Sequence, residues 1–177
     1  MSETQIQTDF FDRMRRIVVV VMLAAGVAAI LGSGLDWVVI TERPSLRPGF
    51  DFQEQNETVE EPEVTEPFSG VDATYGIYSL AGGVVLIVSA LLLLRIRRGR
   101  FAWLGFAAAI SIGGIAVAAF RGIADTSSDL YQEMDIVGRA EPALGLILVG
   151  TAGVVGLIAS GVGVAATPYR GPEEAPA

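Results

Sequence analysis

Residues 17–35 read IVVVVMLAAGVAAILGSGL, nineteen consecutive residues without a charged side chain. A helix needs roughly 20 apolar residues to cross a hydrocarbon core about 30 Å thick. A helix that is apolar on every face belongs in a protein core or in a membrane. A cleaved secretory signal is the alternative, because Arg15 and Arg16 precede the stretch, but the apolar part of a signal is only about 7–15 residues long. We therefore expect an uncleaved membrane-spanning helix.

Three further charge-free blocks follow, and the composition agrees with them: 51% of the residues are hydrophobic and 18% are charged. The sequence predicts an all-α integral membrane protein, a four-helix bundle with spans over 17–35, 76–94, 102–120 and 143–166. The segments outside the spans are then 1–16, 36–75, 95–101, 121–142 and 167–177.

Arginine placement predicts the orientation of the spans. Cytoplasmic segments of membrane proteins carry an excess of basic residues. The N-terminal segment, the 95–101 connection and the C-terminal tail together hold eight arginines, against four in the two longer connections, which hold 15 of the 20 acidic residues. We expect both termini in the cytoplasm and the chain in the plasma membrane. The arginines expected at lipid headgroups are Arg95, Arg97, Arg98 and Arg100.

The segments between spans differ in character. Residues 37–41, WVVIT, are aromatic and β-branched and predict a short strand. The acidic, proline-containing stretch over 51–66 predicts disorder. Its carboxylates lack the spacing of an EF-hand, so a solvated tether is favoured over a metal site. In the second outer segment, Asp125 and the following TSS resemble a helix start, and Leu130, Met134 and Val137 would share one face of a short surface helix.

The N-terminal segment has two interpretations. Ile6, Phe10 and Met14 recur at four-residue spacing among charged residues. This pattern fits a short amphipathic helix lying on the inner leaflet, and the alternative is a frayed tail.

Three residues at the ends of the spans are predicted interface anchors. Trp37 follows the first span and Trp103 begins the third, and tryptophan favours headgroup depth. Arg121 directly follows the third span, where its stem can lie along the helix and its guanidinium among headgroups. The alternative for Arg121 is a cross-span ion pair with Asp36 or Glu141.

The groups that carry most enzyme chemistry are missing from the sequence. It contains no Cys, His or Lys, and the four spans contain no ionisable side chain. This argues against a thiol or Schiff-base nucleophile, a His-ligated metal or redox cofactor, and a proton-coupled transporter. The net charge of −8 argues against nucleic acid. We expect no catalytic residues, no cofactor and no metal.

Small residues at four-residue spacing are the main signal inside the spans. They let helix backbones approach closely, either within the bundle or against another protein. Span 1 contains two such ladders, the second being 25/29/33. The residues predicted to pack helices are Ala24, Ala28, Gly32, Gly105, Ala109, Gly113, Ala152, Gly156 and Ser160.

The layout resembles that of claudin-like proteins, which have four spans, both termini inside, a long first outer loop and a shorter second one. The Gly34-Leu35-Asp36-Trp37 stretch is similar to the G-L-W opening of their first loop, but this chain lacks the cysteine pair that follows there. The chain also looks like small four-span proteins of actinobacteria. Its partners are expected to be the lipid bilayer and another membrane protein, or a second copy of itself. The leading interpretation is a non-catalytic accessory or scaffold subunit; the alternative is a small channel or transporter component that acts as an oligomer.

Overall fold

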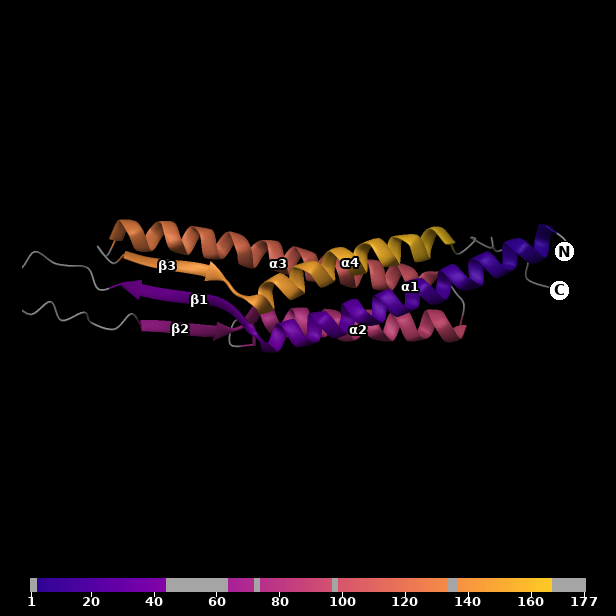
Figure 1. The fold of residues 1–177 in the computed structure, drawn as a ribbon, viewed down its shortest axis with the longest axis horizontal. Coiled ribbons are helices and arrows are strands. Elements are labelled where there is room, and N and C mark those ends of the chain that lie inside the picture. Colours follow the sequence, from indigo (N-terminus) through magenta and orange to yellow (C-terminus); the bar gives the residue numbers. More distant parts are fainter. Residues whose placement is uncertain (1–2, 44–63, 72–73, 97–98, 134–136, 167–177) are drawn as a thin grey trace, which may run out of the picture.

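The computed structural model describes residues 3–43, 64–71, 74–96, 99–133 and 137–166. Within these ranges the chain is mostly helical, with four helices: α1 (Glu3–Gly34), α2 (Thr74–Ile96), α3 (Arg100–Glu133) and α4 (Leu144–Ala166) (Figure 1). All four contain a segment long and apolar enough to cross a membrane; these segments are Phe10–Gly34, Thr74–Ile96, Arg100–Ile123 and Leu144–Ala166. The prediction of four spanning helices is confirmed at this level.

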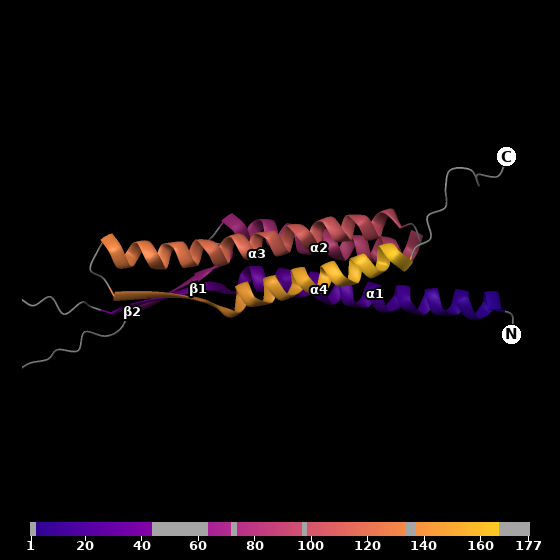
Figure 2. The ribbon, with the colours of Figure 1, turned by 90° about the horizontal axis from the view of Figure 1, so that it is seen from above.

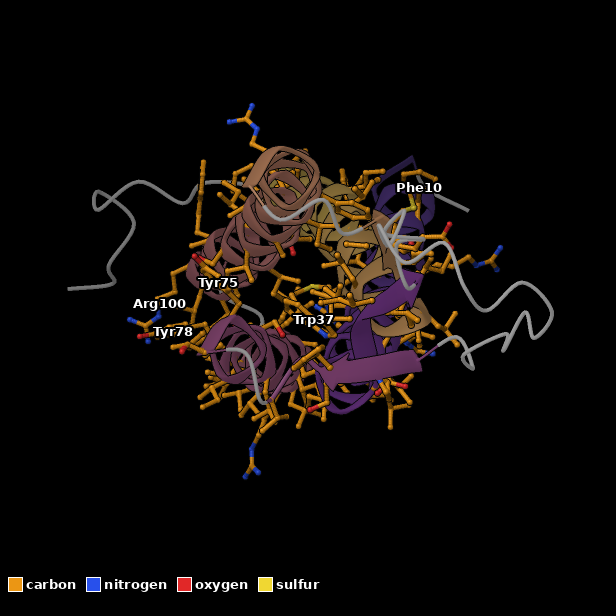
Figure 3. All side chains as sticks on the ribbon, turned by 90° about the vertical axis from the view of Figure 1, so that its left-hand side faces the viewer. Phe10, Trp37, Tyr75, Tyr78 and Arg100 are labelled. Carbon is orange, nitrogen blue, oxygen red and sulfur yellow. The ribbon has the colours of Figure 1, made fainter. Side chains whose placement is uncertain are left out.

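The helices form a ring around an apolar core. α1 and α3 each pack against both α2 and α4, so α1 and α3 lie at opposite corners (Figure 3). Each helix contributes a fully buried side chain to the interior: Met22 from α1, Leu86 from α2, Ile112 from α3 and Leu146 from α4. The bundle interior is therefore filled by apolar side chains.

Glycines allow the helices to cross at short range. A Cβ atom added to Gly83 of α2 would lie 2.9 Å from the carbonyl oxygen of Gly26 in α1. A Cβ on Gly153 of α4 would lie 2.7 Å from the amide nitrogen of Gly113 in α3. Both distances are shorter than side chains allow, so only glycine permits backbones to approach in this way.

The N-terminal segment is neither a separate surface helix nor a tail. Residues 3–16 continue directly into the first span as one helix, α1, of 32 residues. No glycine or proline precedes Gly26, so the sequence contains no residue that would end or bend the helix after Arg16. At 1.5 Å per residue α1 is about 48 Å long, and its N-terminal part extends past the ends of the other helices (Figure 2).

The opposite end of the bundle carries a three-stranded antiparallel sheet of order β2-β1-β3. Its strands are β1 (Asp36–Arg43), β2 (Val64–Ser69) and β3 (Val137–Pro142). β1 is the strand predicted over residues 37–41. The description all-α is therefore incomplete. The acidic stretch at 51–63 lies outside the described residues, and its last part, 64–66, belongs to β2.

The prediction of a separate short surface helix within residues 121–142 is wrong. α3 continues without interruption to Glu133, so Leu130 lies in a helix that began at Arg100, and Val137 begins β3; Met134 lies outside the described residues. No proline lies between Arg100 and Glu141, and a helix already under way needs no new N-cap at Asp125. The extended part of α3 runs beside the sheet (Figure 1).

Candidate functional site

Trp37 joins the sheet to the bundle. The β1–β2 register shifts between Asp36 and Val38, which leaves Trp37 as the extra residue of a bulge. A bulge changes the direction of a side chain relative to its neighbours. The indole is 2% exposed, and its Nε1 donates a hydrogen bond of 2.8 Å to the carbonyl of Gly32 in α1. Figure 3 shows Trp37 at the centre of the bundle end, whereas Tyr75 and Tyr78 lie at its periphery.

Backbone contacts around Trp37 fix the positions of three further segments. The Trp37 carbonyl accepts a hydrogen bond of 2.8 Å from the amide of Ala143, just before α4. A Cβ on Gly70, which follows β2, would collide with the indole ring, so this glycine lets the turn lie against Trp37. A Cβ on Gly145 would lie 2.7 Å from the carbonyl oxygens of Gly32 and Asp36. The start of α4 is therefore held closely against the end of α1.

An apolar cleft of about 400 Å³ lies between the sheet and α3. Val38 and Ile40 of β1 share one face of the sheet, and their register partners Phe68 and Ala140 line the cleft with them. The complete lining is Trp37, Val38, Ile40, Phe68, Ser69, Tyr75, Ala118, Ala119, Gly122, Ile123 and Ala140. Its size and apolar character are those of small-molecule sites, which are roughly 300–1,000 Å³ and mostly hydrophobic.

Small residues on α3 leave the cleft open. Where a helix packs tightly on a sheet, large side chains fill the space between them. Three of the four residues by which α3 lines the cleft are small, namely Ala118, Ala119 and Gly122, and the fourth is Ile123; a Cβ added to Gly122 would meet no atom of the described residues within 4 Å. The cleft is therefore open because most of the α3 side chains that line it are small.

A strip of small residues on α3 faces away from the bundle. We call Ala107, Ser111, Gly114, Ala118 and Gly122 the outer lane; all five are exposed. Their spacing of four, three, four and four residues places them on one helix face. The exposed faces of the other spans carry mainly large apolar side chains, among them Val20 and Leu31 on α1 and Val84, Val88, Leu91 and Leu94 on α2. The outer lane leads into the cleft, because Ala118 and Gly122 belong to both.

The hydroxyl groups of the spans are mostly bonded within the bundle. Ser33 of α1 and Ser79 of α2 lie 2.5 Å apart through their Oγ atoms, and both are buried. Ser111 and Thr151 are exposed, but each donates to the carbonyl four residues earlier in its own helix. Ser160 is buried beside Gly105, and its Oγ has no hydrogen-bond partner among the described residues. These hydroxyls form no continuous polar path through the described part of the bundle.

The predicted packing residues divide between inner and outer faces. In span 1 the ladder that packs is Ala25, Ala29 and Ser33, all buried, whereas Ala24 is exposed and Ala28 half-buried. Gly32 is buried against α4 at Gly145 and Val149. The other predicted ladders face each other across the α3–α4 contact: Ala152, Gly156, Ser160, Gly105 and Ala109 are buried, and Gly113 is half-buried.

The predicted anchors also differ in position. Trp103 is 59% exposed and stacks edge-on against Phe106, in keeping with an outward-facing position. Trp37 is predicted at headgroup depth, and the structure buries its ring within the protein, where the bulge turns it inward. Arg121 is exposed and forms no ion pair with Asp36, Glu141 or any other side chain that the structure describes.

The basic connection is described only in part. Arg95 lies in the last turn of α2 and is exposed, and Arg100 begins α3, where its guanidinium lies 5.1 Å from the ring centroid of Phe101. Arg97 and Arg98 lie outside the described residues.

Sequence reasoning missed the outer lane and the cleft. The spacing of Ala107, Ser111, Gly114 and Ala118 is visible in the sequence and could have revealed the outer lane. It is the same kind of spacing as that of the inward-facing Gly105 ladder, so the sequence alone did not separate the two faces.

No known protein family matches the chain by comparison with family models, and no curated protein matches it. The resemblance to claudin-like proteins therefore remains one of layout. The four spanning helices define the class: the chain is a multi-pass membrane protein.

Proposed function

We propose that the chain is a non-catalytic accessory subunit of the plasma membrane that binds a transmembrane helix of another envelope protein along the outer lane. The observation that carries the proposal is the exposure of five small residues on one face of α3. Small residues allow a second helix to approach closely, and van der Waals packing drives association in lipid. The lane is long enough for four helical turns of contact.

The filled interior supports this role over that of a channel. A pore needs a water-lined path, but Met22, Leu86 and Ile112 are fully buried at the centre of the bundle. A pore between several copies would need a polar stripe on an outward face, and the exposed hydroxyls of Ser111 and Thr151 are already bonded to their own helices. The exposed faces of the helices are therefore suited to contact lipid or another protein, and they do not line a pore.

The proposed orientation places the sheet and the extension of α3 outside the cell and both termini in the cytoplasm. The arginine distribution supports it, since the connection between α2 and α3 contains four arginines and no acid.

A pair of variants tests the proposed function. Gly114→Leu places a large side chain in the outer lane, where an added Cβ meets no atom within 4 Å, so the bundle itself should fold. Ala81→Leu makes the same kind of change at an exposed position of α2. Each variant is extracted gently from membranes of the producing organism, and the co-purifying proteins are identified. We expect Gly114→Leu to lose a partner that the wild type and Ala81→Leu retain. Equal recovery of every co-purifying protein by both variants would contradict the proposal.

A further inference from the structure

We propose that the cleft between the sheet and α3 binds one acyl chain of an outer-leaflet phospholipid, with its phosphate paired to Arg121. The choice of leaflet rests on the proposed orientation, whereas the cleft itself requires no partner at the outer lane. Because Ala118 and Gly122 belong to both, an acyl chain in the cleft leaves Ala107, Ser111 and Gly114 for the partner helix.

The depth of the cleft argues for lipid. Ala118, Ala119 and Gly122 lie in the last turns of the spanning segment of α3, and Tyr75 lies in the first turn of α2. The cleft therefore opens at the level where the spans end on the sheet side. At this depth the protein is surrounded by the parts of the lipid acyl chains that lie just below the headgroups.

The cleft is continuous with the membrane-facing surface. The cleft residues Ala118 and Gly122 of α3 and Tyr75 of α2 are themselves exposed, and the exposed Tyr78 lies one turn beyond Tyr75. An acyl chain can pass from the lipid shell into the cleft without crossing a polar barrier. Burying it against Val38, Ile40 and Phe68 removes apolar surface that would otherwise face the headgroup region.

Charge complementarity argues for a phospholipid. Arg121 lies three residues after Ala118 of the cleft, so the two are neighbours on the surface of α3; it is exposed and has no ion pair among the described side chains. A guanidinium binds phosphate through paired hydrogen bonds. A lipid with its chain in the cleft has its phosphate at the end of the spans, where Arg121 lies.

Fluorescence of Trp37 provides the test, because its indole lines the cleft but is 2% exposed. Trp103→Phe makes Trp37 the only tryptophan, and the full-length protein is reconstituted with phosphatidylglycerol or phosphatidylcholine brominated near the glycerol end of the acyl chain. Bromine quenches indole emission only at short range, so we expect clear quenching of Trp37. Filling the cleft with Gly122→Leu should remove most of this quenching, and Gly114→Leu, two turns away and outside the cleft, should leave it unchanged.

The headgroup part has its own measurement. Arg121→Gln should weaken the quenching by both lipids, because both carry the phosphate that Arg121 pairs with, and unchanged quenching by both would overturn the phosphate pairing. Ala118→Leu serves as a second cleft-filling variant if Gly122→Leu does not fold. The inference is overturned if Trp37 is not quenched, or if a folded cleft-filling variant is quenched as strongly as its parent. A loss of partner in the Gly114→Leu experiment would leave this result unaffected.

Discussion

The close crossing of α3 and α4 predicts opposite effects for the same substitution at two glycines. In Gly153→Ala, the new Cβ would lie 2.7 Å from the backbone nitrogen and 2.8 Å from the Cα of Gly113. Because backbone atoms cannot rotate away, the two helices must separate. In Gly114→Ala, the new Cβ meets no atom within 4 Å. The two sites are both interior positions of helices that pack on each other, so they form a matched pair.

The magnitudes follow from general values for helices and cores. Replacing glycine by alanine in a helix interior stabilises it by roughly 0.5–1 kcal/mol, which is the whole effect expected at Gly114. At Gly153 the steric penalty of overpacking, about 1–3 kcal/mol, opposes this gain. The free energies of unfolding of the two variants should therefore differ by about 1–3 kcal/mol in favour of Gly114→Ala.

Equilibrium unfolding in mixed micelles measures this difference. Purified protein in a mild detergent is titrated with a denaturing detergent, and helix content is followed by circular dichroism. The wild type should lie between the two variants. Equal stabilities for Gly153→Ala and Gly114→Ala, or a more stable Gly153→Ala, would refute the α3–α4 crossing described here.

Three further predictions concern the orientation of the spans in the membrane and the end of the bundle that carries the sheet. Ser69→Cys and Gly99→Cys each place a single cysteine in this cysteine-free chain. An impermeant thiol reagent applied to intact cells should label the cysteine at 69 and not the one at 99; labelling at 99 would show that the proposed orientation is wrong. Trp37→Phe should lower the free energy of unfolding by about 1–3 kcal/mol, because the buried Gly32 carbonyl loses the 2.8 Å hydrogen bond from the indole and keeps only the 3.4 Å one from the Leu35 amide, while the same change at the exposed tryptophan of α3 should be nearly neutral in the same titration. A double-mutant cycle of Ser33→Ala and Ser79→Ala should give a coupling of about 0.6 kcal/mol and no more than about 1.7; additive effects would mean that the two hydroxyls do not interact.

The helical spans could be predicted from sequence because they depend on a simple quantity, the length of charge-free sequence. The predicted segment 143–166 differs by one residue from α4 (Leu144–Ala166). The strand at 37–41 was also predictable, since its β-branched residues favour an extended chain. These features are decided locally, by composition over one segment.

Features that depend on pairing between distant segments were not predictable. The sequence of β3, VGRAEP, contains a glycine, a proline and two charges, so it has a weak strand signal and becomes a strand through its pairing with β1. Trp37 follows a span and reads as an interface anchor, and only the bulge in β1 turns it inward. The direction of a small-residue face on α3 depends on where α2 and α4 pack, which the sequence of α3 alone does not contain.

The central claim is that the outer lane of α3 contacts a partner helix, and site-specific photocrosslinking tests it most directly. A photoreactive amino acid replaces Ala107 in the lane or, as the control, Ala81 on the exposed face of α2, and membranes of the producing organism are illuminated. The account predicts a protein adduct of one defined mass from position 107 and none of that mass from position 81. The same adduct from both positions, or lipid adducts alone from position 107, would contradict it.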